Sequence, residues 1–343
     1  MDKNHIYTVV IAVLLLAVII DVNLKDYAGD YASMPIGYMS ANPKGSQDVE
    51  TVTVAYLPVV QSLPLYLAID KGYFKDEGLD VKALKIDSPN LIFDALISGQ
   101  ADFGAPGTAA GITGITNYVK PGELEIFELV GGGNSTTNDL LLVGINSSID
   151  SISGLKGHKL GILPGIQFRT IAKDILAQNG LSDKDVTIVE LAPGLQPQAL
   201  ASGQVDAILS IEPTGTIVES KGIGRELVHA PMVKYISDPW YGAVGVVKTK
   251  YATEHPETAR KVISVLAKAT EEIRADPASA KKHLVGYTPL DENMAEDVPL
   301  PEYRMYDEVT GNDILALQKF LDIFHDFGVI NGTVNAQAMM YAP

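Results

Sequence analysis

Short apolar stretches with two different periods alternate along the chain after about residue 50. The segment TVTVAYLP (Thr51–Pro58) alternates and is rich in β-branched residues, which predicts a strand. The next segment, Leu63–Gly78, has apolar residues at helical spacing and stops at a glycine suited to a helix C-terminus. The same patterns predict strands at Leu79–Ile86, Ala101–Pro106 and Glu123–Val130, and helices at Pro89–Gly99 and Gly107–Val119. This alternation predicts parallel βαβ units, with helices covering a sheet.

The series of elements then starts again. Strands are predicted at His158–Leu163, Asp185–Leu191 and Val205–Ile211, with helices at Gln167–Gly180 and Pro197–Gly203. Two longer helices follow at His255–Pro277 and Asn312–Gly328, and we expect both to pack on the first lobe.

A short repeat supports this division into two lobes. ALISGQADFG (Ala95–Gly104) and ALASGQVDAI (Ala199–Ile208) match at six positions with a fixed offset of 104 residues. Each copy ends a predicted helix and begins a strand, so we interpret its Gly as a left-handed cap and its Asp as a stabiliser of the turn. The chain is long enough for two lobes with a core each. We expect a first lobe at 51–142 plus 241–343 and a second at 143–240.

The N-terminal region has a different composition. Ile6–Ile20 carries no charge, follows Lys3, and is short for a membrane span but suited to a signal sequence. No small-residue cleavage site follows, so we expect residues 1–25 to be a retained anchor; a cleaved signal or a buried core segment is the alternative. Residues 26–50, rich in Gly, Pro, Ser and Asn, then read as a linker. The folded body would lie outside the cytoplasmic membrane.

Charge and composition exclude several classes of function. The net charge is −16 and no Lys/Arg cluster occurs, which argues against nucleic acid as a partner. The absence of cysteine excludes disulfides, thiol catalysis and Cys-ligated zinc. The six histidines show no metal-ligand spacing, and the chain has no P-loop, paired carboxylates or G-x-S-x-G elbow. We therefore expect neither catalysis, nor a metal, nor a cofactor.

The candidate binding site follows from the predicted topology. Ligands of open α/β sheets bind at the carboxyl ends of parallel strands, beside helix N-termini. Four strand-to-helix junctions and the two predicted crossings between lobes therefore supply the candidates. These are Pro58, Gln61, Ser62, Leu63, Gly107, Thr108, Asn138, Gln167, Phe168, Arg169, Glu212, Trp240 and Tyr241.

Several of these candidates have a purely structural alternative. The offset of 104 aligns Thr108 with Glu212, so we expect a hydroxyl and a carboxylate at equivalent positions of the two lobes. The alternatives are an N-cap for Thr108, a first-turn acid for Glu212, helix capping and packing for Gln167 and Phe168, a surface position for Arg169, and a buried aromatic pair for Trp240 and Tyr241.

From Thr51 to about Gly328 the chain resembles the substrate-binding proteins of the nitrate/sulfonate/taurine group of ABC importers. The pyrimidine-precursor proteins of thiamine biosynthesis belong to the same superfamily. The resemblance is carried by the two repeat copies and by LPLYLAIDKGYFKDEGLDV, SSIDSISGLKGHKLGI, NGLSDKDV and YATEHPETARKV. It implies an α/β, two-lobe, type II periplasmic-binding fold, with a mostly parallel sheet flanked by helices in each lobe. It also implies a small-molecule ligand in the cleft, and permease and ATPase subunits as partners.

The resemblance leaves the ligand open. Sulfonate binders of this group usually have a small hydroxyl residue after the glycine of the third junction, where this chain has Ile166. We therefore expect a neutral or weakly cationic organic ring. Glu212 would accept a hydrogen bond from its N–H or amine, Thr108 and Gln61 would orient its far side, and Trp240 or Phe168 would cover one face. A small anion such as a sulfonate or nitrate is the alternative. A pyrimidine-synthesising enzyme, which would need reactive His and Cys side chains, and a membrane-tethered sensor are the competing classes.

Overall fold

The computed structural model describes residues 50–136 and 138–343. The predicted anchor at 1–25 and all but the last residue of the predicted linker at 26–50 lie outside these residues. Within the described part, no helix combines the length and the apolar character needed to cross a membrane.

The first lobe is built on a six-stranded sheet in the order β11-β4-β10-β3-β1-β2. β1, β2, β3 and β4 run in one direction, and β10 and β11 run in the other. The strands are β1 (Glu50–Tyr56), β2 (Leu79–Lys85), β3 (Phe103–Ala109), β4 (Leu124–Gly132), β10 (Trp240–Lys248) and β11 (Glu302–Met305).

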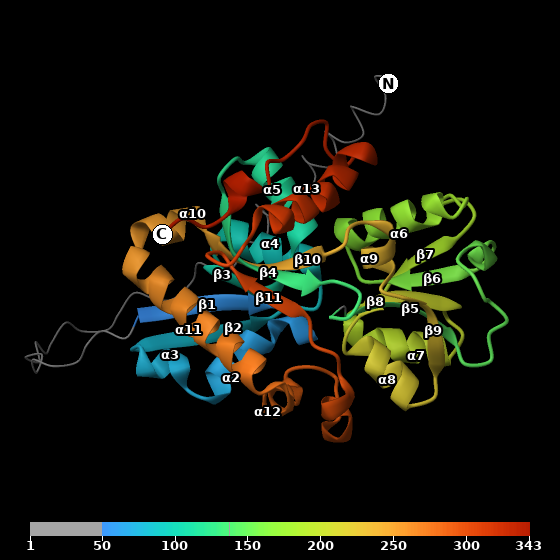
Figure 1. Cartoon of the computed structure of the whole chain (residues 1–343), viewed down its shortest axis with the longest axis horizontal. Helices are drawn as coiled ribbons and strands as arrows, with labels where there is room; N and C mark the ends of the chain where they lie inside the picture. The colour runs from blue at the N-terminus through green and yellow to red at the C-terminus, as the bar shows by residue number, and fades with distance from the viewer. Residues whose placement is uncertain (1–49, 137) are drawn as a thin grey trace, which may run out of the picture. The chain divides into compact units, whose positions relative to one another are not determined.

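Helices cover both faces of this sheet (Figure 1). One face carries α2, α3 and α11, whose buried side chains form one apolar cluster with the strands; the other carries α4, α5 and α13. The two long helices predicted after residue 250 therefore pack on this lobe. The helices are α2 (Leu63–Asp70), α3 (Tyr73–Asp76), α4 (Pro89–Ser98), α5 (Ala110–Val119), α10 (Thr249–Glu254), α11 (Pro256–Ala275), α12 (Pro277–Ala280) and α13 (Gly311–Asp326).

The second lobe is built on a five-stranded sheet in the order β7-β6-β8-β5-β9, in which only β5 runs against the others. Its strands are β5 (Asp139–Gly144), β6 (Lys159–Ile162), β7 (Thr187–Glu190), β8 (Ala207–Ile211) and β9 (Gly224–His229). In Figure 1, α6 (Ile166–Gln178) and α9 (Pro231–Tyr235) lie on one face, and α7 (Gln196–Ala201) and α8 (Thr214–Ser220) on the other.

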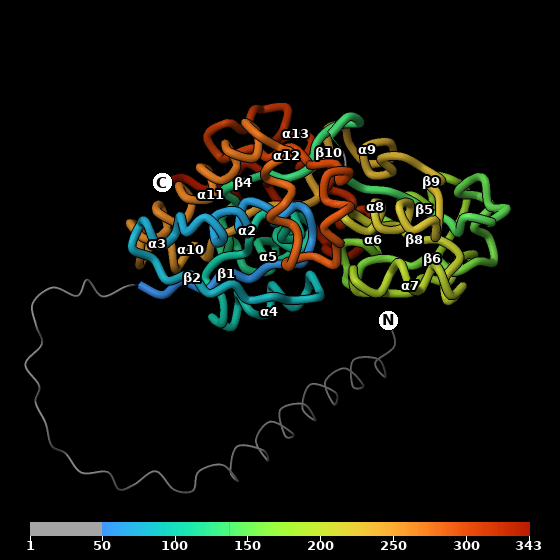
Figure 2. Tube along the Cα trace, turned by 90° about the horizontal axis from the view of Figure 1, so that it is seen from below, coloured from blue at the N-terminus to red at the C-terminus, as the bar shows by residue number. Residues whose placement is uncertain are grey.

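The two sheets share one topology. In each, the first strand after a crossing between lobes is inserted, antiparallel, next to the third strand of the βαβ series: β10 beside β3, and β5 beside β8. Figure 2 shows the early and late segments of the chain together in the first lobe, with the middle segment forming the second. The described residues therefore confirm the predicted two-lobe α/β fold.

The repeated junction has the same conformation in both lobes. Gly99 and Gly203 have φ values of 80° and 71°, which only glycine adopts readily. The following residues fold back equivalently, with Gln100 donating to the Ala95 carbonyl and Gln204 to the Ala199 carbonyl, both at 2.9 Å. The aspartate of the motif was predicted to stabilise its own turn, and this prediction is wrong. Its carboxylate accepts instead from a backbone N–H of the neighbouring strand, that of Thr53 for Asp102 and that of Lys159 for Asp206.

Two predicted boundaries are wrong. The first lobe was expected to extend to Leu142, but β5 pairs with β8 and β9, so the chain leaves the first lobe between Gly132 and Asp139. The helix predicted over Leu63–Gly78 is broken into α2 and α3, because Gly72 adopts a left-handed conformation with φ of 74°.

The expectation of a separate core in each lobe is also wrong for one face. A single cluster of buried apolar side chains runs from α4, α5 and α13 of the first lobe to α6 and α9 of the second. The cluster is continuous because α13 packs against both β10 and α6, across the junction between lobes. On the opposite face of the second sheet, under α7 and α8, a small core lies within the second lobe, although Ile217 of α8 packs in the cluster formed by α2, α3 and α11 of the first lobe.

Candidate functional site

A small cavity lies between the lobes, at the carboxyl ends of β1, β3 and β8. Its volume is about 20 Å³, which is room for about one water molecule. The first lobe contributes Leu57, Gln61, Pro89, Gly107, Ala109, Val130, Trp240, Gly242 and Ala243, and the second contributes Asn138, Gln167, Phe168 and Ile211. Six of the predicted site residues are therefore brought together: Gln61, Gly107, Asn138, Gln167, Phe168 and Trp240.

Three polar side-chain atoms in this lining are buried without a hydrogen-bond partner. They are the Gln61 Oε1 acceptor and the Asn138 Nδ2 and Trp240 Nε1 donors, on side chains that are each less than 5% exposed. A buried polar group without a partner costs about 1–3 kcal/mol, so folded proteins rarely leave several in one place. Three of the eight such atoms found in the described residues belong to residues of this one cavity, which makes it the candidate binding site.

The approach of Gln61 to the cavity depends on a glycine. Gly107, at the end of β3, has φ of 112°, and a Cβ added there would lie 2.7 Å from the Ser62 hydroxyl oxygen. Only glycine therefore lets the strand end lie against the turn that carries Gln61 and Ser62. The Ser62 hydroxyl itself donates to the Leu57 carbonyl and is not part of the lining.

Gln167 is the polar residue that connects the two lobes at the cavity. Its Oε1 accepts from the Gly111 N–H in the first turn of α5 at 2.7 Å, and its Nε2 donates to the Gly242 carbonyl of β10 at 2.9 Å. A backbone bond of 3.3 Å from the Val60 N–H to the Glu212 carbonyl also crosses between the lobes. The lobes are thus closed on each other by direct contacts.

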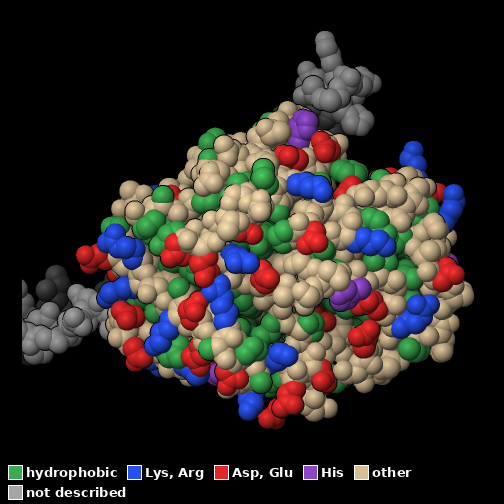
Figure 3. Space-filling view, in the orientation of Figure 1, with side chains coloured by type: hydrophobic (Ala, Val, Ile, Leu, Met, Phe, Trp, Pro, Cys, Tyr) green, Lys and Arg blue, Asp and Glu red, His purple; other side chains and the backbone are tan. Residues whose placement is uncertain are grey.

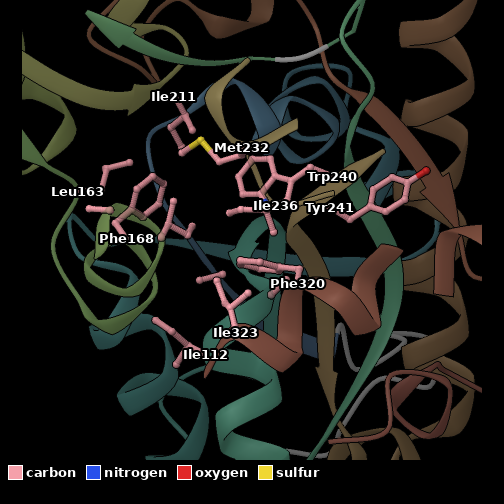
Figure 4. Close-up of a cluster of buried hydrophobic side chains, with 14 of the residues drawn as sticks. Ile112, Leu163, Phe168, Ile211, Met232, Ile236, Trp240, Tyr241, Phe320 and Ile323 are labelled. Carbon is pink, nitrogen blue, oxygen red and sulfur yellow. The ribbon is translucent and has the colours of Figure 1, made fainter. Parts of the chain in front are cut away.

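Aromatic and aliphatic side chains form the rest of the wall. Figure 4 shows Phe168, from the second lobe, and Trp240, from the first, in one cluster of apolar side chains. Trp240 packs edge-to-face on Phe320 of α13, with ring centroids 5.7 Å apart. None of the lining residues is charged. The lining therefore offers apolar surface and polar partners but no charge.

The structure does not place the Glu212 carboxylate in the cavity lining. Its Oε2 accepts from the Thr216 N–H at 3.0 Å, so the side chain caps its own helix, α8. Burial raises its pKa to about 7, and the bonds to Thr216 offset part of that rise. Glu212 is not a first-turn acid either, because it precedes the N-cap residue Pro213, and α8 has no acidic residue in its first turn. Its backbone carbonyl, not its carboxylate, reaches the other lobe.

The remaining predicted site residues also lie outside the lining. Thr108 donates to the Ala105 carbonyl at 2.8 Å, and Arg169 pairs with Glu190 on the surface at 2.7 Å. Tyr241 points away from the cluster in Figure 4 and donates to Asp313 at 2.6 Å. Pro58 and Leu63 are buried in the first lobe. None of these side chains lines the cavity.

The sequence prediction missed the apolar half of the lining. The missed residues are Leu57, Ala109 and Ile211, beside predicted junction residues, Gly242 and Ala243, after Trp240, Val130, at the end of a predicted strand, and Pro89, at the start of a predicted helix. Their position at the ends of predicted elements was the available signal. It was not used, because apolar residues there are equally expected of the core.

Comparisons with known proteins place the chain in a family. The model of the NMT1/THI5 like family matches residues 59–280. The chain belongs to this family. A putative aliphatic sulfonates-binding protein of Bacillus subtilis (strain 168) is 28% identical over 266 residues, 76% of this chain and 77% of that protein. The 4-amino-5-hydroxymethyl-2-methylpyrimidine phosphate synthase THI13 of Saccharomyces cerevisiae is 23% identical over 263 residues, 71% of this chain and 72% of that enzyme.

Solved structures share the fold. The alkanesulfonate-binding protein SsuA from Xanthomonas axonopodis pv. citri, bound to MOPS, superposes with a TM-score of 0.70 at 20% identity, covering 88% of this chain and 99% of that one. The periplasmic nitrate-binding protein NrtA from Synechocystis PCC 6803 gives a TM-score of 0.67 at 13% identity, covering 85% of each. The predicted family resemblance and the periplasmic-binding fold are confirmed.

Proposed function

We propose that this protein is an extracytoplasmic solute-binding protein that holds a small, uncharged organic molecule between its lobes and delivers it to an ABC importer. The observation that carries the proposal is the interlobe cavity, where one buried acceptor and two buried donors have no partner and no lining residue is charged. A molecule with a carbonyl-type acceptor, an N–H or O–H donor and an apolar body would satisfy all three.

The two lobes provide the mechanism. Each supplies part of the lining, so a ligand bound to one lobe gains its remaining contacts only when the other closes over it. Closure removes water from the cleft and so strengthens the polar contacts. The state of the lobes then tells a membrane permease whether a ligand is bound.

The relatives support this class of function. The Bacillus relative is described as binding aliphatic sulfonates, and the two solved structures are binding proteins for alkanesulfonate and nitrate. On the face shown in Figure 3, Lys and Arg side chains are scattered among Asp and Glu, in agreement with a partner other than nucleic acid.

An enzyme is the competing function, because the yeast relative is a pyrimidine phosphate synthase. Of the described histidines, none lines the cavity, and the chain has no cysteine. The described residues also contain no group of three or more His, Asp or Glu arranged to hold a metal ion. We therefore favour binding over catalysis.

A membrane tether completes the proposal. The uncharged run Ile6–Ile20 would anchor the protein, and residues 26–50 would let the body move relative to the membrane. Mass spectrometry of the protein purified from its host tests this: a mature N-terminus after Ile20 would show a cleaved signal and a free protein.

The function is tested by a thermal-shift screen of the full chain. The compounds are pyrimidines, flavin fragments and lactams against taurine, alkylsulfonates, nitrate and bicarbonate. A ligand at one hundred times its dissociation constant stabilises the folded protein by about 2.7 kcal/mol, which gives a clear rise in Tm. We expect an uncharged compound to give the largest rise. If a sulfonate or nitrate does so instead, the ligand is the anion of the family alternative.

A further inference from the structure

The Gln167 side chain occupies a socket that belongs to the first lobe. The socket consists of one donor, the Gly111 N–H, and one acceptor, the Gly242 carbonyl, and the carboxamide of Gln167 bonds to both. Gly111 is the second residue of α5, so its N–H is one that the helix leaves without an internal partner. The side chain is 3% exposed and reaches the socket from the other lobe.

Two glycines give the socket its shape. A Cβ on Gly111 would lie 2.2 Å from the Phe324 ring and 3.0 Å from Gln167 Oε1. A Cβ on Gly242 would lie 1.9 Å from the Trp240 ring. Any side chain at either position would displace the aromatic wall or the carboxamide. The backbone therefore receives a planar group at this point only because both residues are glycine.

The socket lies beside the unpartnered atoms of the cavity. Gln167, Gly242 and Trp240 all line the cavity, together with Gln61 and Asn138. The cavity alone holds about one water molecule, which is too little for an organic ligand. If the carboxamide swings out, its volume joins the cavity, and the N–H and carbonyl of the socket join the three unpartnered groups.

We infer that the Gln167 carboxamide occupies the place of a ligand group in the unliganded protein. The ligand would displace it and bond to the socket with an acceptor and an N–H donor side by side, as amides, ureas and lactams do. This inference rests on the proposed function, because it takes the cavity as the ligand site. It narrows the ligand class, since a carboxylate or sulfonate places an oxygen against the Gly242 carbonyl. It also couples entry of the ligand to separation of the lobes, because release of the Gln167 side chain breaks the hydrogen bonds that join α6 to the first lobe.

The test uses a fragment that matches the removed group. Gln167→Ala deletes the equivalent of acetamide, so acetamide and acetate become an isosteric probe pair for the empty socket. We expect acetamide at millimolar concentrations to raise the Tm of Gln167→Ala saturably at neutral pH, and acetate to bind at least about tenfold more weakly, because its second oxygen meets a carbonyl. Wild type, whose socket is filled, should respond to neither.

The matched control is Gln178→Ala. Gln178 is an exposed residue of the same helix, whose amide bonds to Asp174 and to the Tyr235 carbonyl. It should behave as wild type toward both fragments. Equal binding of acetamide to wild type and Gln167→Ala, or equal binding of acetate and acetamide to the variant, would overturn the inference.

A second variant keeps the inference testable if Gln167→Ala does not fold. Gln167→Glu retains the acceptor for Gly111 but, when ionised, loses the donor for Gly242. Small-angle X-ray scattering of the unliganded variant should show more open lobes than wild type at neutral pH and reclosure on acidification. A radius of gyration equal to that of wild type at both pH values would contradict the role of the socket.

These tests separate the inference from the proposed function. Fragment binding and lobe closure are measured without the natural ligand and without the transporter. A positive fragment result with a sulfonate as the natural ligand would refute the uncharged-ligand proposal, and it would also show that the natural ligand does not bind in the socket, although the socket itself accepts amides. A lactam ligand that binds without displacing the Gln167 side chain would support the uncharged-ligand proposal and refute the inference about the socket.

Discussion

Asp102 and Thr53 are joined by a 2.9 Å hydrogen bond in which the Thr53 N–H donates to the Asp102 Oδ2, and Asp206 accepts from the Lys159 N–H in the same way at 2.8 Å. In the opposite direction, the Asp102 N–H donates to the Thr53 carbonyl and the Asp206 N–H to the Lys159 carbonyl, each at 2.9 Å. The repeated aspartate therefore fixes the third strand of each βαβ series to the first strand, whose carboxyl end carries a junction loop of the cleft.

Removal of this aspartate should loosen each lobe to a different extent. We expect Asp102→Ala to lower the free energy of unfolding by about 1–2 kcal/mol, because it leaves a half-buried N–H without a partner. Asp206→Ala should cost less, because that side chain is 40% exposed and water can replace it. Urea denaturation measures both, with the exposed Asp94→Ala as control. Equal losses for Asp94→Ala and Asp102→Ala would show that the strand contact does not matter.

Glu128 should make the protein less stable as the pH rises. It is fully buried in the first lobe, bonds to the Thr270 hydroxyl at 2.9 Å, and burial raises its pKa from 4.5 to about 8. The folded state therefore binds the proton more tightly than the unfolded state, and this stabilisation is complete below about pH 4.5 and lost as the pH rises through about 8.

Glu128→Gln cannot ionise and should remove that loss. We expect the variant and wild type to be similarly stable near pH 5, and the variant to be more stable by about 1–3 kcal/mol near pH 9. Thermal unfolding across this range, with the exposed Glu257→Gln as control, checks the prediction. Parallel pH profiles for wild type and Glu128→Gln would contradict it.

Glu212 should affect stability and not ligand affinity. Its carboxylate caps α8 outside the cavity lining, and burial raises its pKa to about 7, so its stabilisation is lost as the pH rises through about 7. Glu212→Gln should therefore raise the Tm above neutral pH relative to wild type and leave the dissociation constant of the bound ligand within about threefold. Calorimetric titration decides this, and a tenfold change in affinity would restore the contact predicted from the sequence.

Trp240→Phe removes the indole N–H and keeps an aromatic ring, so it tests whether the N–H contributes to ligand binding. The N–H is buried without a partner, so its own loss costs little, but the smaller ring leaves a space in the apolar cluster, and we expect the free energy of unfolding to fall by about 1–3 kcal/mol. Ligand affinity should fall about 5- to 50-fold if the N–H bonds to the ligand.

The neighbouring substitution Tyr241→Phe is the matched control for Trp240→Phe. It removes the 2.6 Å bond to Asp313 outside the cavity and should lower stability by about 1–2 kcal/mol without changing affinity. Thermal unfolding and titration of both variants give the comparison. The same loss of affinity in both would mean that the effect comes from the strand and not from the indole.

The sequence predicted the topology well because periodicity and glycine placement report directly on backbone conformation. Gly99 and Gly203 adopt the left-handed caps that the repeat required. The break at Gly72 was missed, because the apolar spacing continues across it. The boundary at Leu142 was placed too late, because Asp139–Gly144 is an apolar run that fits either sheet.

The site was only partly predictable, for a different reason. Position along the chain indicated correctly that the junctions meet, but it did not show which side chains bond to their own turn. Thr108 and Glu212 align in the repeat, yet each is satisfied locally, by the Ala105 carbonyl and the Thr216 N–H. Gln167 was placed at a helix start, but its bonds to Gly111 and Gly242 depend on how closely the lobes approach.

The topology of the crossings has a practical consequence. Trp240 lies directly opposite Gly132 in the ladder between β4 and β10, so the chain departs from and returns to the first lobe at a single point. Every strand of the second sheet falls between these two residues. The second lobe is therefore an insertion between two adjacent antiparallel strands of the first lobe, β4 and β10. Replacing this insertion by the second lobe of a relative would replace Asn138, Gln167, Phe168 and Ile211 together, and so exchange one wall of the cavity in a single chimaera.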